Sequence, residues 1–176
     1  MPFIGYFLNS EHLEPWVWHI GKLVVNFNAI ELMTLTWLEQ LEKDPERHDE
    51  LVNLSFGKRV AAIKSIVGKT AVSENLKQEI RDAWGKTKEI ARVRNSIGHN
   101  PVIFGWHTED GQQPERPPDF IGPLNVKNSR NSGGAGALIV EFDQITNAID
   151  DSVAGIQRLH DLLIMLLDEM SKTQST

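Results

Sequence analysis

The stretch from Ser73 to Ile97 reads SENLKQEIRDAWGKTKEIARVRNSI and carries the clearest helical signal of the chain. Ser73 is a good N-cap, and inward-facing positions then recur every three or four residues. These positions are Leu76, Ile80, Ala83, Thr87, Ile90, Arg94 and Ile97. Gly98 is expected to be the left-handed residue after the helix, and Pro101 forbids its continuation. The segment predicts a long helix that places an arginine, Arg94, in a position normally taken by an apolar side chain.

Helical patterns of the same kind lie on both sides of this segment. The first helix is expected from Pro15 to Lys43, because proline suits a first helical turn and Asp44-Pro45 ends the pattern. Further helices are expected over residues 56–69 and 143–170. The first helix has a second stripe of side chains, which predicts burial on two sides, as in a bundle. That stripe holds Val17, Val24, Asn28, Glu31, Leu35 and Leu38.

Between the third and the last helix the period of the sequence changes. Val102, Phe104 and Trp106 alternate with other residues as a strand would, and residues 138–142 are expected to be its partner. The connection is rich in proline and glycine, so residues 107–136 predict a mobile inserted loop. We therefore expect one domain over residues 1–176. It is mostly α, an up-down bundle of about four helices with a β-hairpin and long loop inserted before the last helix.

Composition narrows the class of protein. The chain has no cysteine, which excludes disulfides and thiolate chemistry. It begins without a basic, apolar leader and has no apolar run long enough to cross a bilayer, so we expect a cytoplasmic protein with no membrane association. Two Gly-Lys-Thr triplets lack the earlier glycine that a phosphate-binding loop needs, and no histidine pair has metal-site spacing. No cofactor and no metal are therefore expected.

The charge of the chain is unevenly distributed. The formal net charge is −6, which argues against a general nucleic-acid coat protein. Residues 58–94 nevertheless hold ten Lys or Arg against four acidic residues, a local charge of +6. This basic segment indicates either a solvated helix surface or a partner that is a polyanion.

Arg94, Asn95 and His99 form the candidate site at the end of this basic segment. A left-handed Gly98 would turn the chain and bring His99 back beside Arg94, where Asn95 could hold the imidazole or a phosphate oxygen. A protonated histidine beside an arginine attracts phosphate. A structural interpretation stands beside this one: Arg94 pairs with Glu31 inside the bundle, and His99 caps the last carbonyl groups of the helix.

The pattern Arg94-Asn95-x-x-x-His99 at the end of a bundle helix resembles the motif of the HEPN family of small α-helical proteins. The first helix, with Trp18, Asn28, Ile30 and Glu31, is similar to the corresponding helix of bacterial HEPN-like proteins. The resemblance covers the bundle, about residues 13–100 and 143–170. The inserted strands and loop lie outside it.

The resemblance implies a metal-independent endoribonuclease that acts as a homodimer, with two motifs facing each other across a two-fold groove. The resemblance implies that His99 acts as an acid or base and that Arg94 stabilises charge on the phosphate. It also implies that Asn95 orients this pair and that Glu31 anchors Arg94. Such a protein is expected to act on RNA as a toxin or defence factor, and the sequence does not identify an antitoxin or another protein partner. The alternative is a non-catalytic helical dimerisation or interaction module, and a third hypothesis is a nucleotide-binding regulator.

Overall fold

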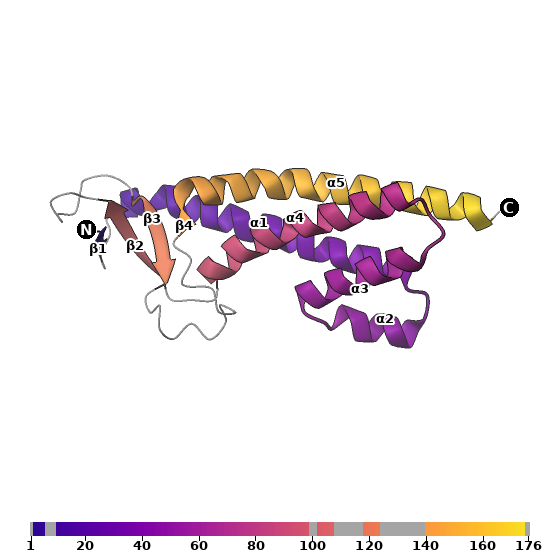
Figure 1. Cartoon of the computed structure of the whole chain (residues 1–176). Coiled ribbons are helices and arrows are strands. Elements are labelled where there is room, and N and C mark those ends of the chain that lie inside the picture. The colour runs from indigo at the N-terminus through magenta and orange to yellow at the C-terminus, as the bar shows by residue number, and fades with distance from the viewer. Residues whose placement is uncertain (1, 6–9, 99–101, 108–117, 124–139, 175–176) are drawn as a thin grey trace. The chain divides into compact units, whose positions relative to one another are not determined.

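The computed structural model describes residues 2–5, 10–98, 102–107, 118–123 and 140–174 of the 176-residue chain. Five helices and four strands occur in these residues (Figure 1). The helices are α1 (Ser10–Leu41), α2 (Pro45–Val52), α3 (Phe56–Lys69), α4 (Glu74–Gly98) and α5 (Phe142–Gln174). The strands are β1 (Pro2–Gly5), β2 (Val102–His107), β3 (Phe120–Pro123) and β4 (Val140–Glu141). The prediction of a mostly helical bundle with antiparallel strands before the last helix is confirmed.

The chain forms two compact units. The sheet unit consists of Met1–Val25 and Ile90–Asp150, and the helical unit consists of Asn26–Glu89 and Asp151–Thr176. Each unit has its own buried side chains, among them Trp16 and Ile121 in the first and Trp37 and Ile63 in the second. Burial of such large apolar surfaces is the main stabilising contribution in each unit.

Aromatic pairs join the helices of the helical unit. Trp37 of α1 and Trp84 of α4 are both fully buried, and their rings meet edge to face at a centroid distance of 5.6 Å. Phe27 of α1 meets Phe56 of α3 in the same way at 5.1 Å. Edge-to-face pairs of this kind add about 0.5–1.5 kcal/mol to the contribution of their buried area. The aromatic residues of α1 therefore hold both α3 and α4.

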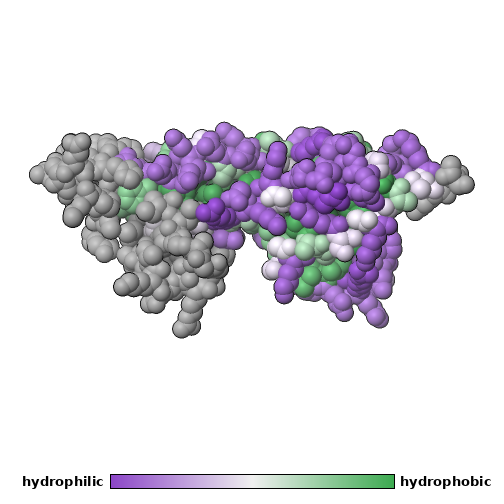
Figure 2. Space-filling model, in the orientation of Figure 1, coloured by the Kyte–Doolittle hydropathy of each residue, from purple (hydrophilic) through white to green (hydrophobic). Residues whose placement is uncertain are grey.

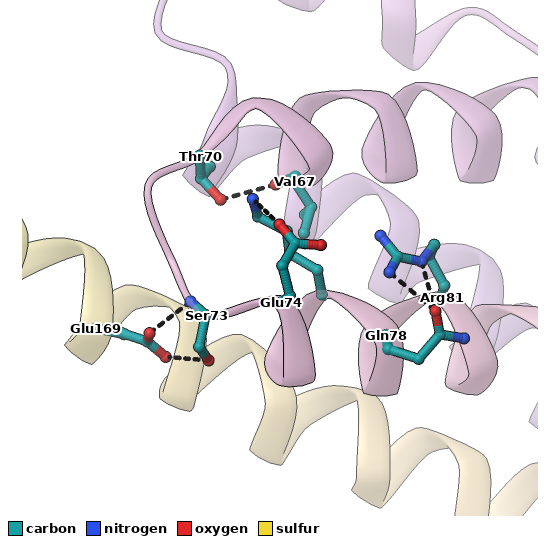
Figure 3. A network of polar contacts seen from close by, with 8 residues as sticks. Val67, Thr70, Ser73, Glu74, Gln78, Arg81 and Glu169 are labelled. Carbon is teal, nitrogen blue, oxygen red and sulfur yellow. Dashed lines mark hydrogen bonds and ion pairs between the residues drawn. The ribbon is translucent and has the colours of Figure 1, made fainter.

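Polar contacts connect α5 to the other helices of this unit. Nδ2 of Asn26 donates a hydrogen bond of 2.9 Å to Oγ of the fully buried Ser152. Near the end of α5, the carboxylate of Glu169 accepts a hydrogen bond of 2.6 Å from the backbone N–H of Ser73 and a longer one, 3.3 Å, from its hydroxyl (Figure 3). Ser73 thus precedes α4 as predicted, and Glu169 supplies the negative charge that favours a helix N-terminus.

The sheet unit is built on four antiparallel strands in the order β1-β2-β3-β4. Trp16 of α1 is 0% exposed, and its indole Nε1–H donates a hydrogen bond of 2.9 Å to the carbonyl oxygen of Pro118, just before β3. The same ring meets Phe104 of β2 and Phe142 of α5 edge to face, at centroid distances of 5.8 and 5.1 Å. One tryptophan therefore joins α1 to the sheet and to the start of α5.

Gly105 of β2 allows the close packing of the sheet. It lies directly opposite Phe120 of β3 in the register, and both residues are buried. A Cβ atom at residue 105 would overlap the Phe120 ring, with its distance to Cε2 only 2.6 Å. Glycine is thus required here because an aromatic ring occupies the place of its side chain.

The strand pairing differs from the sequence prediction. Residues 138–142 were expected to pair with the strand at 102–106. In the described residues, β2 instead pairs with β1 and β3, and β4 pairs with β3 alone. The apolar run that ends at Phe142 is divided, because α5 begins at Phe142 itself. β3 lies inside the segment expected to be a loop, and its proline is the last residue of the strand.

The helix boundaries and exposed faces also differ in part. α1 begins at Ser10 and contains Pro15, and Pro45 begins α2, a helix that the sequence analysis missed. The carboxylate of Asp44 accepts a hydrogen bond of 3.1 Å from the N–H of Glu46, so the dipeptide that ends one helix also starts the next. The predicted burial of the second stripe of α1 is wrong for Val17 and Asn28, which are exposed.

Candidate functional site

Arg94 and Asn95 lie on the last turns of α4, in the sheet unit. Arg94 is half-buried at a position where the helical pattern faces inward, and Asn95 is exposed. Nη1 of Arg94 donates a hydrogen bond of 3.0 Å to Oδ1 of Asn95. The amide therefore contacts the guanidinium directly and holds one of its edges.

Gly98 does not have the conformation that the sequence predicted. It is the last residue of α4, and its φ angle lies outside the left-handed region. The prediction of a left-handed C′ glycine is therefore wrong. Proline restricts most strongly the residue directly before it, so Pro101 leaves the helical conformation open to Gly98. The chain turn that would have brought His99 back beside Arg94 does not occur at residue 98.

The side chain of Arg94 lies beside Gly98. A Cβ atom at residue 98 would be 3.9 Å from Nε and 4.0 Å from Cδ of Arg94, which is ordinary van der Waals contact. An alanine would thus fit without displacing the guanidinium.

Replacing Gly98 with alanine is expected to raise the free energy of unfolding by about 0.5–1 kcal/mol, since alanine restricts the unfolded chain and has the higher helix propensity. Chemical denaturation followed by circular dichroism measures this change. Gly105→Ala is the matched control with the opposite sign, because overpacking against Phe120 is expected to lower stability by about 1–3 kcal/mol. A loss of stability in Gly98→Ala would contradict the helical backbone at residue 98.

His99, the third member of the motif, lies outside the described residues. Its approach to Arg94, within one chain or across two copies, stays a prediction. The described part of the motif brings together Arg94 and Asn95.

Glu31, the predicted anchor of Arg94, belongs to the helical unit and pairs there with Arg59. The carboxylate oxygen Oε1 lies 3.7 Å from Nη2 of Arg59, and both side chains are mostly buried. Nη1 of Arg59 also donates to the carbonyl oxygens of Val52 and Leu54, at 3.3 and 3.1 Å. Arg59 therefore attaches the segment that connects α2 with α3 to helix α1. A further pairing of Glu31 with Arg94 stays a prediction.

The residues of α1 that carried the family resemblance have different environments. Ile30 is fully buried, whereas Asn28 is exposed and Trp18 is 59% exposed. Nζ of Lys22 lies 4.9 Å from the centre of the Trp18 ring, a cation–π contact. Figure 2 shows hydrophobic residues beside hydrophilic ones on the visible surface.

Three basic residues of α3 and α4 were not singled out by the sequence analysis. Lys64 on α3 is close enough to Arg81 and Lys88 on α4 for their charges to shift its pKa. The seven-residue spacing of Arg81 and Lys88 would have placed them on one helix face. Their proximity to Lys64 results from the packing of α3 and α4, and no local sequence pattern predicts it.

Neither a metal-binding cluster nor a membrane-spanning helix occurs in the described residues. In this part of the chain, no three His, Asp or Glu side chains form a group that could hold a metal ion. None of its helices combines the length and apolar character that crossing a membrane requires. Comparison with known proteins gives no matching family model, no matching curated protein and no matching solved structure. The HEPN resemblance therefore stays a prediction from Arg94, Asn95, His99 and their helical context.

Proposed function

We propose that this protein is a metal-independent endoribonuclease of HEPN type that acts as a homodimer. The observation that supports the proposal best is the hydrogen bond between Arg94 and Asn95 near the end of a long bundle helix. A guanidinium can bind a phosphate through two parallel, charge-assisted hydrogen bonds. Residues 58–94, with their local charge of +6, supply an attractive potential for a polyanion despite the net charge of −6.

The proposed reaction is attack of a ribose 2′-hydroxyl on the adjacent phosphorus. The bond between O2′ and phosphorus forms, the bond between phosphorus and O5′ breaks, and the products are a 2′,3′-cyclic phosphate and a 5′-hydroxyl. O2′ loses a proton and the leaving O5′ gains one; His99 carries out one of these two transfers and water the other. Arg94 stabilises the negative charge that develops on the phosphate oxygens, and Asn95 orients Arg94. DNA lacks the attacking hydroxyl and is not cleaved.

A second copy of the chain gives the proposed site its two-fold form. Five residues turn a continuous helix through about 500°, so side chains at positions 94 and 99 of an unbroken helix would point about 140° apart. In the proposed homodimer, Arg94 of one copy serves the phosphate together with His99 of either copy. We place this activity in the cytoplasm, as a toxin or defence factor restrained by an antitoxin or another protein partner.

RNA cleavage is expected to persist when all divalent metal ions are chelated. Purified protein is incubated in EDTA with a 5′-labelled single-stranded RNA and, as a control, with DNA of the same sequence. The RNA products should carry cyclic phosphate and 5′-hydroxyl ends, while the DNA remains intact. Absence of cleavage, or activity that requires added metal, would contradict the proposed function.

The second candidate function is a non-catalytic interaction module with Arg94, Glu31 and His99 as structural groups. Exposed apolar side chains on α1 favour it, because Val17 and Val25 are 62% and 67% exposed. This alternative predicts no RNA turnover. It also predicts a loss of up to about 3 kcal/mol in stability for Arg94→Ala, since Glu31 would lose this counter-ion and keep only Arg59.

A further inference from the structure

A cluster of three basic side chains lies on α3 and α4 of the helical unit. Lys64 of α3 and Arg81 of α4 are half-buried, and Lys88 of α4 is exposed. Some cations of this unit have carboxylate partners, such as Arg59 with Glu31 and Lys77 with Glu74. Within the described part of the chain, neither Lys64 nor Lys88 forms an ion pair. Two ammonium groups thus lack an ion-pair partner in a chain whose net charge is negative, although the charge of Asp82 acts on Lys64.

The guanidinium of Arg81 is oriented by a neutral group. Its Nε and Nη2 both donate to Oε1 of Gln78, at 3.1 and 2.9 Å (Figure 3). The other end of the same amide donates a hydrogen bond of 2.8 Å to the carboxylate of Asp82. Gln78 therefore fixes the orientation of Arg81 and also forms a hydrogen bond with the carboxylate of Asp82. A guanidinium positioned in this way is suited to bind phosphate.

The surface between Arg81 and Lys88 is open. The two residues are seven positions apart on α4, which corresponds to about 10.5 Å along the helix axis. In the described structure, no heavy atom beyond the local helix lies within 4 Å of where a Cβ of Gly85 would be. A row of cations of this length exceeds the size of one phosphate group and suits a chain of them.

The surroundings of Lys64 in the folded protein disfavour its positive charge and lower its pKa. Burial is the largest cause of the lowered pKa of Lys64, followed by the positive charge of Lys88. The negative charge of Asp82 opposes this shift, and the positive charge of Arg81 adds to it. Because the folded-state pKa lies below the unfolded-state value, the protonated form destabilises the fold at neutral pH, and this effect disappears as pH rises through the folded-state pKa.

We propose that Lys64, Arg81 and Lys88 form a binding surface for the phosphate backbone of single-stranded RNA. The inference deepens the proposed function and rests on it for the choice of RNA as the ligand. The surface recognises charge and spacing, so it binds RNA without preference for sequence. It is distinct from the residues proposed to carry out the cleavage.

The test compares two triple variants of the full chain that change the net charge equally. One replaces Lys64, Arg81 and Lys88 with glutamine, and the control replaces Lys43, Arg47 and Lys172 with glutamine. Fluorescence anisotropy measures binding of a labelled single-stranded 2′-O-methyl RNA, which cannot be cleaved, over a range of salt concentrations. Polyglutamate of equal charge serves as a competitor. Thermal melting shows whether each variant is folded. If the triple variant does not fold, the single variant Lys88→Gln is used in its place.

Loss of three phosphate contacts is expected to reduce the salt slope by about 2 units and to weaken binding about 100-fold at 0.1 M salt, since each contact to a single strand contributes about 0.7. Lys88→Gln alone should reduce the slope by about 0.7. The control triple should keep both the affinity and the slope, and Lys64→Gln should melt no lower than the wild type.

Three outcomes would overturn the inference: no RNA binding by the wild type, equal effects of the two triple variants, or displacement of RNA by polyglutamate at equal charge. Binding by the wild type together with intact natural RNA in the cleavage assay would instead remove the proposed function and leave this surface standing.

Discussion

Arg94→Ala is expected to lower the rate of RNA cleavage about 100- to 1000-fold, the range found when one group that stabilises transition-state charge is removed. His99→Ala is expected to lower it about 100- to 10,000-fold, because a general acid or base is lost. Single-turnover cleavage in EDTA measures both rates. Arg94→Lys should recover only part of the activity, since an ammonium cannot form the two parallel hydrogen bonds of a guanidinium.

Matched controls separate these effects from loss of charge or of fold. Arg92→Ala removes the same charge two residues away on the exposed side of α4, and His160→Ala removes an exposed histidine of α5. Both are expected to cleave RNA at nearly the wild-type rate. If Arg94→Ala retains full activity, or if it loses activity only because it melts at a much lower temperature, the catalytic role of Arg94 is wrong.

The helical part of the fold could be predicted because its signal is local. Leu76, Ile80, Thr87 and Ile90 are buried as the three-four spacing of α4 requires. The same spacing did not identify Trp84, which is buried because Trp37 of another helix covers it. On α5, the apolar Val153 is exposed, whereas the neighbouring Ser152 is buried and accepts a hydrogen bond from Asn26.

Strand pairing and ion pairs depend on residues far apart in the sequence, and here the predictions failed or stayed open. The opposition of Gly105 and Phe120 needs a register that no short motif specifies. Arg59 as the partner of Glu31 likewise follows from the packing of α3 on α1. The contact of Arg94 with Asn95 joins adjacent residues and was within reach of sequence reasoning, but the backbone of Gly98 was not.

Trp16→Ala is expected to lower the free energy of unfolding of the sheet unit by about 4–5 kcal/mol. Truncating a fully buried tryptophan leaves a large cavity, which accounts for about 3–5 kcal/mol. The carbonyl oxygen of the buried Pro118 also loses its indole donor, and an unsatisfied buried group contributes about 1–3 kcal/mol more. Partial collapse of Phe104 and Phe142 into the cavity reduces the sum. Denaturant unfolding followed by circular dichroism and tryptophan fluorescence measures the change.

Trp18→Ala is the matched control, because it removes the same side chain two residues further along α1 from a site that is 59% exposed. Its contacts with Lys22 and with the ring of His19 are lost, and a cation–π pair at an exposed site contributes about 0.5–1 kcal/mol. Trp16→Phe separates the two contributions at the buried site, since it keeps most of the apolar volume and removes the hydrogen bond to Pro118. Equal losses for Trp16→Ala and Trp18→Ala would show that Trp16 does not join α1 to the sheet. A loss for Trp16→Phe as large as that for Trp16→Ala would assign the stabilisation to the indole donor rather than to packing.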